Sequence, residues 1–275
     1  KATAYYLHLL EEQLHYEGVQ NIAAIMMESI TGANGVLIPP KGYMEGVRAL
    51  CDKYGILMIC DEVMAGFGRT GKMFCWQNFD IVPDIITFAK GVNCGYVPLG
   101  GVVMSKEISK YFEENVLQCG LTYSGHTLAC AAGNAAVDYY LNNNVCDHVV
   151  EVGKVLGAWL NEMKEKHACI GEVRQIGLFS AIELVKDKET REPLDFYGKP
   201  NAIKAQAIAK LENEYNIHTY GRENTISICP PLIITEEQLV AVLPKFDEVL
   251  TWIDEQLPTL EKDANYTTAV ACFRK

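Results

Sequence analysis

The sequence predicts an α/β protein in which strands and helices alternate along the first half of the chain. The strands are near-continuous apolar runs, a pattern typical of parallel or mixed sheets that helices cover on both faces. The segments between them have the periodicity of helices, and one of them ends near Gly55. The expected strands are residues 22–29, 56–62, 84–90 and 100–105, and the expected helices are residues 42–55, 106–115 and 126–144.

The first 18 residues read as an amphipathic helix, whose apolar face comprises Tyr6, Leu7, Leu10 and Leu14. Near residue 140 the pattern changes to that of a smaller α+β domain. Its expected helices are residues 145–167, 201–214 and 236–256, and its expected strands are residues 177–185, 217–220 and 225–229. We therefore predict a division into residues 1–140 and 141–275. Four strands are few for a doubly wound domain, so we expect part of the large sheet to lie outside this chain.

Composition and charge exclude several classes of function. The 275 residues carry a net charge of −11 and a pI of about 5.1, which disfavours nucleic acid as a partner because phosphate binding needs clustered lysine and arginine. No apolar run approaches the length of a membrane span, and the first residues lack the layout of a signal peptide. No G-x-G-x-x-G follows a strand, so a dinucleotide-dependent dehydrogenase is also disfavoured.

Cysteine and histidine usage indicates a reducing compartment and no metal centre. The ten cysteines form no C-x-x-C pair, and Cys51, Cys60, Cys130 and Cys229 lie in apolar segments. This pattern predicts reduced, buried thiols in a cytosolic protein. The six histidines show no ligand spacing. A metal site on Asp61 and Glu62 is disfavoured because adjacent strand residues point to opposite faces.

An acid and a lysine stand at the ends of two predicted strands. Asp61 closes the strand ILMIC, and Lys90 closes DIITFAK. Because ligands bind at the carboxyl ends of strands in α/β sheets, both side chains are expected in one crevice. A buried ammonium would be costly there. The alternatives are an ion pair at the sheet edge or a lysine that extends to water.

Glycine-rich and hydroxyl-bearing segments surround this pair. DEVMAGFGRTGK follows the first strand, GVNCGYVPLGG follows Lys90, and GLTYSGHT places Thr122, Tyr123 and Ser124 before a helix. Backbone N–H groups and hydroxyls at a helix start can bind phosphate, although Ser124 or Thr127 is more simply the N-cap. An acid, a lysine and a phosphate cradle together suggest pyridoxal 5′-phosphate (PLP), with a Schiff base on the lysine and the acid at the pyridine nitrogen.

The segment DEVMAGFGRTGKMFCWQNFDIVPDIITFAKGV closely resembles the signature of the class III (omega) aminotransferases, which have the PLP fold type I. ESITGANGVLIPPKGYMEGVRALCDKYGILMICDEV, PLGGVVMS and GLTYSGHTLACAA fit as well, so the resemblance runs from about residue 20 to about residue 256. It implies a partial large-domain sheet in residues 1–140 and a C-terminal small domain in residues 141–275.

The resemblance also implies roles for single residues. Lys90 matches the Schiff-base lysine, Asp61 the acid at the pyridine nitrogen, and Val63 the residue packed on one ring face. Thr122 matches the threonine that reaches the cofactor phosphate of the neighbouring subunit, which implies a homodimer with a shared active site. Glu28 matches the acid that ends the earlier strand and supports the site. Phe67 and Arg69 are expected to shape the loop and the dimer contact.

The substrate class follows from departures within the resemblance. Relatives acting on ornithine or 4-aminobutyrate carry a second glutamate where this chain has Ala33, and glutamine where it has Met64. Both departures resemble the branch that uses pyruvate as acceptor and ω-amino acids, taurine or amines as donors. That branch binds the substrate carboxylate with an arginine shortly before PPL. Tyr220 holds that place here, which leaves Arg222 as the candidate, with a surface loop as the alternative.

Members of the family have an N-terminal part, with a phosphate loop and a stacking aromatic residue, that residues 1–20 do not supply. We therefore expect this chain by itself to bind cofactor weakly. Two other classes of function are carried forward. One is a non-catalytic assembly module, which the intact Asp61 and Lys90 disfavour. The other is a PLP aminomutase on the same fold.

Overall fold

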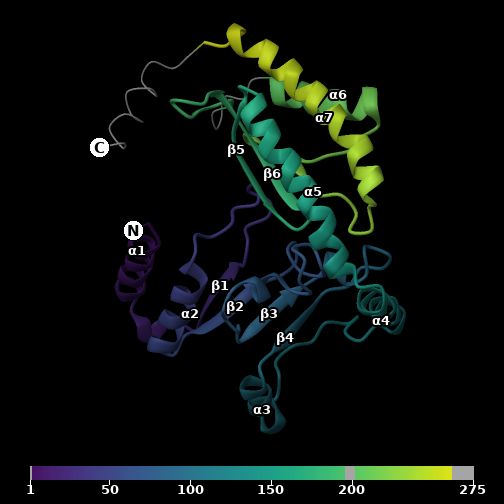
Figure 1. Cartoon of the computed structure of the whole chain (residues 1–275). Helices are drawn as coiled ribbons and strands as arrows, with labels where there is room; N and C mark the ends of the chain where they lie inside the picture. Colours follow the sequence, from purple (N-terminus) through teal and green to yellow (C-terminus); the bar gives the residue numbers. More distant parts are fainter. Residues whose placement is uncertain (1, 196–201, 262–275) are drawn as a thin grey trace. The chain divides into compact units, whose positions relative to one another are not determined.

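A computed structural model describes residues 2–195 and 202–261 of the chain (Figure 1). The chain forms two compact units. The first comprises residues 1–32 and 38–147, and the second comprises residues 33–37 and 148–275. The domain division at residue 140 stays a prediction, because compact units of this chain are not necessarily the domains of the whole protein.

The first unit contains a four-stranded mixed sheet. Its strands are β1 (Ala24–Glu28), β2 (Leu57–Asp61), β3 (Ile85–Phe88) and β4 (Gly101–Met104), in that order across the sheet. Strand β2 is parallel to β1 and β3, whereas β4 is antiparallel to β3. These are the four strands predicted from apolar runs, and the mixed sheet confirms the predicted α/β class.

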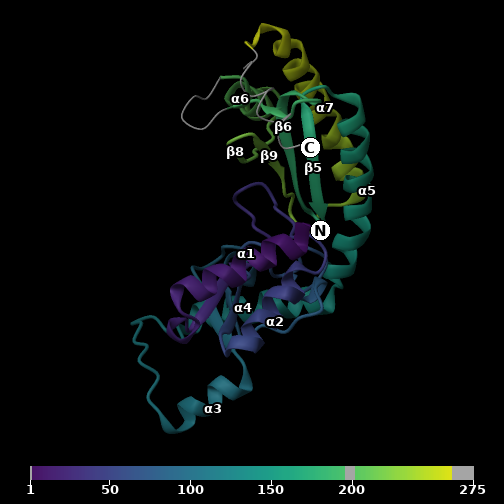
Figure 2. The ribbon, with the colours of Figure 1, turned by 90° about the vertical axis from the view of Figure 1, so that its left-hand side faces the viewer.

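Two helices, α1 (Ala2–Glu17) and α2 (Tyr43–Tyr54), lie side by side in the first unit (Figures 1 and 2). Leu14 is buried in the core of this unit, and Leu7 and Leu10 pack against it. A Cβ on Gly46 would lie 2.2 Å from Cδ1 of Leu7, so the glycine allows α1 to approach α2 closely. Tyr6 is 54% exposed. Within this chain, the buried stripe of α1 is therefore narrower than its apolar face.

The remaining helices of the first unit are α3 (Lys106–Glu114) and α4 (Thr127–Asn142). The short 3₁₀ helices are η1 (Val19–Asn21), η2 (Cys75–Asn78) and η3 (Lys90–Val92). His126 caps α4, since its Nδ1 accepts a hydrogen bond from the amide of Ala129 at 3.4 Å. The prediction of Ser124 or Thr127 as the N-cap was therefore wrong: Thr127 is already the first helical residue.

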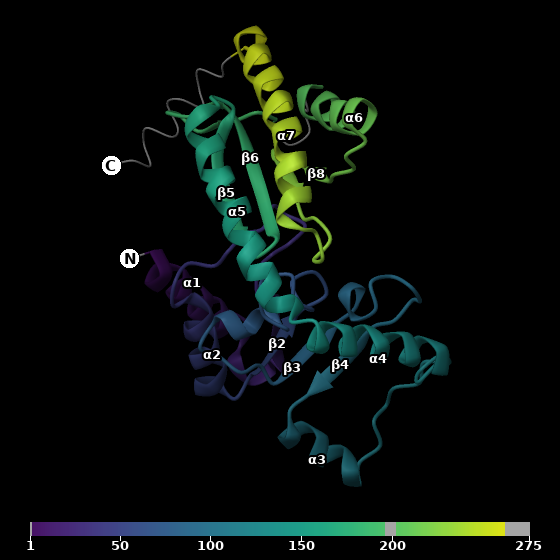
Figure 3. The same cartoon turned by 45° about the vertical axis from the view of Figure 1, so that its right-hand side comes forward.

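The second unit contains an antiparallel sheet. Its strands lie in the order β5 (Ile170–Ile176), β6 (Phe179–Asp187), β9 (Thr225–Ile228) and β8 (Gly221–Arg222), and β7 (Glu192–Pro193) pairs with β6. Strand β5 was not predicted, and residues 217–220 form no strand. Helix α7 (Glu236–Gln256) packs between α5 (Val145–Lys166) and α6 (Ile203–Tyr215) (Figure 3). A short 3₁₀ helix, η4 (Leu257–Thr259), follows α7.

Two close approaches organise the second unit. A Cβ on Gly153 of α5 would lie 2.7 Å from the carbonyl oxygen of Gly177, so this helix rests directly on the β5–β6 turn. The segment 33–37 is held on the sheet by Arg174, whose Nε donates to the carbonyl oxygen of Gly35 at 2.7 Å. Gly35 has a φ of 101°, and a Cβ there would lie 2.7 Å from Cγ2 of Thr225. Glycine is therefore required at this position.

The cysteines of the described residues are free thiols. Cys51 and Cys60 are buried as predicted, and burial raises the pKa of Cys60 to about 11. Cys130 and Cys229 are exposed, so the prediction of burial was wrong for these two. Their apolar neighbours in sequence do not enclose them within this chain. None of the helices among residues 2–195 and 202–261 is both long enough and apolar enough to cross a membrane.

Candidate active site

The carboxyl ends of β1, β2 and β3 bring predicted site residues next to one another. Glu28 ends β1 and is in register with Asp61, which ends β2. Asp61 is in turn in register with Thr87 of β3, three residues before Lys90. Parallel pairing therefore places Glu28, Asp61 and the approach to Lys90 along one edge of the sheet, where α/β proteins bind ligands.

Lys90 does not lie in the strand. The strand ends at Phe88, and Lys90 begins η3 with a φ of 42°, in the left-handed region that non-glycine residues seldom occupy. The prediction of a strand through residue 90 was therefore too long by two residues. The side chain is exposed, so the expected cost of a buried ammonium does not arise within this chain. Strained backbone of this kind clusters at functional sites in proteins.

Asp61 keeps capacity to accept a hydrogen bond. Its Oδ1 accepts from the amide of Val63 at 2.9 Å, which fixes the carboxylate against the turn that follows β2. Within the described residues, Oδ2 makes no hydrogen bond. The hydroxyl of Thr87, in register beside it, is buried and also lacks a hydrogen-bond partner among those residues. A half-buried carboxylate beside an unpaired hydroxyl fits the protonated ring nitrogen of a bound heterocycle.

The loop after β2 packs onto the turn that carries Lys90. Phe67 has a φ of 53° and is buried, and its ring contacts the rings of Phe74, Phe88 and Tyr140. A Cβ on Gly91 would lie 2.7 Å from Cβ of Phe67. The hydroxyl of Tyr140 donates to the carbonyl oxygen of Gly91 at 2.7 Å. Phe67 thus shapes the loop, and the packing fixes Gly91 directly after Lys90.

Of two further predicted site residues, Glu28 has a hydrogen-bond partner within the chain and Thr122 is exposed. Oε2 of Glu28 accepts from the amide of Gly32 at 2.8 Å, which closes the turn after β1. Thr122 is exposed in the turn before α4. Among the described residues, no hydrogen bond joins the side chain of Thr122 to Asp61 or Lys90. Its expected contact with a neighbouring subunit stays a prediction.

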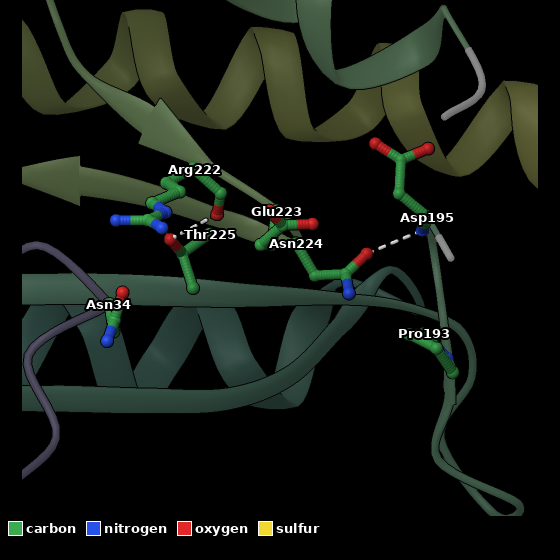
Figure 4. Close-up of a pocket in the computed structure, with 7 residues that line it drawn as sticks. All are labelled: Asn34, Pro193, Asp195, Arg222, Glu223, Asn224 and Thr225. Atoms are coloured by element: carbon green, nitrogen blue, oxygen red, sulfur yellow. Dashed lines mark hydrogen bonds between the residues drawn. The ribbon is translucent and has the colours of Figure 1, made fainter. Parts of the chain in front are cut away.

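Arg222 lines a pocket of about 470 Å³ in the second unit. The other lining residues are Asn34, Pro193, Asp195, Glu223, Asn224 and Thr225 (Figure 4). Gly221 and Arg222 form the two-residue strand β8, which pairs with β9. The carbonyl oxygen of Arg222 accepts from Oγ1 of Thr225 at 2.7 Å, while the guanidinium group is exposed. Asn34 lies on the Arg222 side of this pocket (Figure 4).

Sequence reasoning missed the supporting residues Thr87 and Tyr140, and it considered Glu62 only as a metal ligand. Glu62 is fully buried among hydrogen-bond donors. The usable signal in the sequence was a second acid directly after Asp61. A charge that close to an apolar strand must be paired or hydrogen-bonded if the fold buries it. Thr87 and Tyr140 carried no comparable signal.

Comparison with known proteins decides the family. A family model described as aminotransferase class-III matches residues 3–250 of the chain. The chain belongs to the class-III aminotransferases. The chain is 35% identical over 260 residues to the taurine–pyruvate aminotransferase of Bilophila wadsworthia, covering 92% of this chain and 56% of that protein. It is 34% identical over 250 residues to the hypotaurine/taurine–pyruvate aminotransferase of Paracoccus denitrificans, with coverages of 88% and 54%.

A solved structure gives a stronger match to this class-III chain. The taurine:2-oxoglutarate aminotransferase of Bifidobacterium kashiwanohense, solved in complex with PLP and glutamate, superposes with a TM-score of 0.91 at 68% identity. The match covers 93% of this chain and 57% of that one. The chain thus spans little more than half the length of these relatives. The fold is that of the PLP-dependent aminotransferases of fold type I, and PLP is the cofactor of the family.

Proposed function

We propose that the protein carrying this chain uses PLP to transfer an amino group from an ω-amino acid, taurine or a related amine to a 2-oxo acid. The observation that carries the proposal is the pairing of β1, β2 and β3, which sets Asp61 beside the strand that leads to Lys90. Membership of the class-III family supplies the reaction type. A non-catalytic module would not require a carboxylate at this edge of the sheet with an oxygen still able to accept a hydrogen bond.

Each site residue has a proposed task. Lys90 would hold the cofactor and, once released, move the proton at the substrate carbon. Asp61 would stabilise the positive charge on the ring nitrogen, and Val63 would pack on the ring face. Thr122 would bind the cofactor phosphate of a second subunit in a homodimer, and Glu28 would support the edge through its turn. When bound, PLP supplies an electron-withdrawing ring that makes the substrate proton acidic.

The 2-oxo acid that accepts the amino group is either 2-oxoglutarate or pyruvate. Ala33 and Met64 resemble the pyruvate-using branch, and the Bilophila and Paracoccus relatives are named for pyruvate. The Bifidobacterium relative is named for taurine and 2-oxoglutarate, at about twice the identity. We therefore propose taurine or a similar ω-amino acid as donor and 2-oxoglutarate as the first acceptor to test, with pyruvate as the second. Arg222 is the proposed ligand for an acidic group of the substrate, since its guanidinium is exposed at a pocket.

The test is made on the whole protein loaded with PLP. Borohydride should reduce the imine to a secondary amine, so the visible absorption band should be replaced by a near-ultraviolet absorption that resists dialysis. Lys90→Ala should abolish this covalent attachment. Lys110→Ala, at an exposed position of α3, is the matched control and should keep the band. Taurine should be consumed when 2-oxoglutarate or pyruvate is added as acceptor, and it should not be consumed when both are left out. Rearrangement of a donor without any acceptor would instead indicate an aminomutase, and absence of a Lys90-dependent band would indicate a non-catalytic module.

A further inference from the structure

Glu62 lies next to the proposed cofactor acid but faces entirely different partners. Its side chain is 0% exposed. Oε1 accepts from the hydroxyl of Ser29 at 2.8 Å and from the amide of Trp76 at 2.9 Å, and Oε2 accepts from the amide of Cys75 at 2.6 Å. The carboxyl group is therefore satisfied by donors alone. The two amides belong to the first residues of η2, whose N–H groups have no partner within the helix.

The main chain of Glu62 adds two further links. Its amide donates to the carbonyl oxygen of Thr87 at 2.8 Å, which ties it to the strand leading to Lys90. Its carbonyl oxygen accepts from the amide of Gly66 at 3.0 Å, and a Cβ on Gly66 would lie 2.7 Å from that oxygen. One residue thus joins the ends of β1 and β3 to both ends of the loop that contains Val63 and Phe67.

We infer that Glu62 is a positioning residue for the transamination site: it fixes the loop after β2, and through this loop it sets the placement of Asp61 and the turn at Lys90. The inference rests on the proposed function. Burial raises the pKa of Glu62, while the amide of Cys75, the hydroxyl of Ser29 and the amide of Trp76 act in the opposite direction. Burying the Glu62 carboxylate costs desolvation energy, and its hydrogen bonds offset that cost. The hydrogen-bond partners of Glu62 lie on three segments: after β1, in β3 and at the start of η2.

Glu62→Gln separates this role from simple packing. Glutamine has the same length, but its amide NH₂ must face one of the donors that the carboxylate accepts, so one hydrogen bond is replaced by opposed donors. Small displacements of a positioned group are costly in catalysis, and we expect kcat to fall by about 10-fold or more while KM for the donor changes by less than about 3-fold. The absorption maximum of the bound cofactor should also shift, because it reports the charge environment set by Asp61.

Ser29→Ala provides the second variant, since it removes one donor and leaves the carboxyl group in place. It should give a smaller change of the same kind, a kcat loss of about 3-fold. Because a buried acceptor loses one donor, the thermal unfolding midpoint should also fall, so kcat is measured well below that midpoint. Wild-type kcat and an unshifted band in Glu62→Gln would overturn the inference. If Glu62→Gln does not fold, Ser29→Ala decides: wild-type kcat and band in that variant would also overturn it.

Wild-type protein is the reference that keeps the two proposals apart. Failure of the proposed function would show as a wild-type protein without a Lys90-dependent band or turnover. Failure of the present inference would show as an active wild type whose Glu62 and Ser29 variants match it. A fall in kcat that merely follows a lower unfolding midpoint, with the band unmoved, would assign Glu62 to stability alone and reject the positioning role.

Discussion

Gly91 and Phe67 are in such close contact that a Cβ on the glycine would lie 2.7 Å from Cβ of the phenylalanine. The contact joins the loop after β2 to the residue that follows Lys90. It explains why a glycine stands there although its φ is not in the left-handed region. The conformational strain is carried instead by its neighbours, Lys90 and Phe67, which both have positive φ.

Gly91→Ala is therefore expected to loosen the site. The added methyl group overpacks a contact in which neither partner can withdraw, and such insertions cost about 1–3 kcal/mol. Hydrogen exchange of the peptide around residues 85–95 should become faster, and cofactor release should quicken. Gly120→Ala is the control, because nothing lies within 4 Å of its Cβ position. Equal exchange in both variants would show that the contact is not constraining.

The anchoring of segment 33–37 gives a second prediction. Arg174→Met keeps the apolar stem but removes the donor to the carbonyl oxygen of Gly35 and the ion pair with Glu183. An unsatisfied buried acceptor costs about 1–3 kcal/mol, so the urea midpoint of the second unit should fall. Protease cleavage within residues 33–37 should also increase.

Arg222→Met is the matched control for that experiment, since the side chain is exposed and surface substitutions usually change stability by less than about 0.5 kcal/mol. The same variant should raise KM for an acidic donor if Arg222 binds the substrate. A urea midpoint in Arg174→Met equal to that of Arg222→Met would contradict the anchoring role.

Much of the fold was predictable because apolar runs identify buried strands. The four strands of the first unit and the helix at residues 236–256 were found from pattern alone. Strand β5, with the sequence IGEVRQI, was missed because most of its residues are only half-buried and several are charged or polar. The strand expected at residues 217–220 does not form: Asn216 takes a left-handed conformation, and pairing with β9 begins only at Gly221.

The candidate site could be predicted as far as its motif reaches, and the roles of its residues stay predictions. Asp61 and Lys90 stand out because charge at the end of an apolar strand is unusual. The left-handed backbone at Lys90 was not predictable, since it accompanies a packing contact between residues 67 and 91 that are distant in sequence. The docking of segment 33–37 on Arg174 is likewise a long-range contact, without any local signature.

His167 supports a prediction for the second unit. Its ring is buried, with Nδ1 at 2.8 Å from Oδ2 of Asp254 and Nε2 at 2.7 Å from Oδ1 of Asp247. Both aspartates lie on α7, so the ring joins this helix to the end of α5. His167→Leu would remove the hydrogen bonds to both carboxylates, and losing such bonds costs about 1–3 kcal/mol.

The measurement for this histidine is urea unfolding of the variant followed by tryptophan fluorescence, because Trp159 and Phe246 are in contact between α5 and α7. His218→Leu is the control, since that side chain is 91% exposed and faces a single carboxylate, Glu212. Its unfolding midpoint should stay close to that of the wild type. A His167→Leu midpoint as high as that of His218→Leu would refute the link between the helices.

Asp247 makes the same junction sensitive to acid. Burial acts to raise the pKa of Asp247, but hydrogen bonds from Lys166 and His167 outweigh it and hold the pKa below its usual value of 3.8. A carboxyl group with a lowered folded-state pKa stabilises the protein above the unfolded-state pKa, and this stabilisation is lost as the pH falls through the folded-state value.

Asp247→Asn should therefore lower the free energy of unfolding by about 1 kcal/mol at neutral pH. The gap should narrow below about pH 4, where the wild-type carboxylate also becomes protonated. Asp138→Asn, at an exposed position of α4, should follow the wild-type profile throughout, whereas a gap for Asp247→Asn that stays constant down to pH 3 would show that the ion pair is not its source.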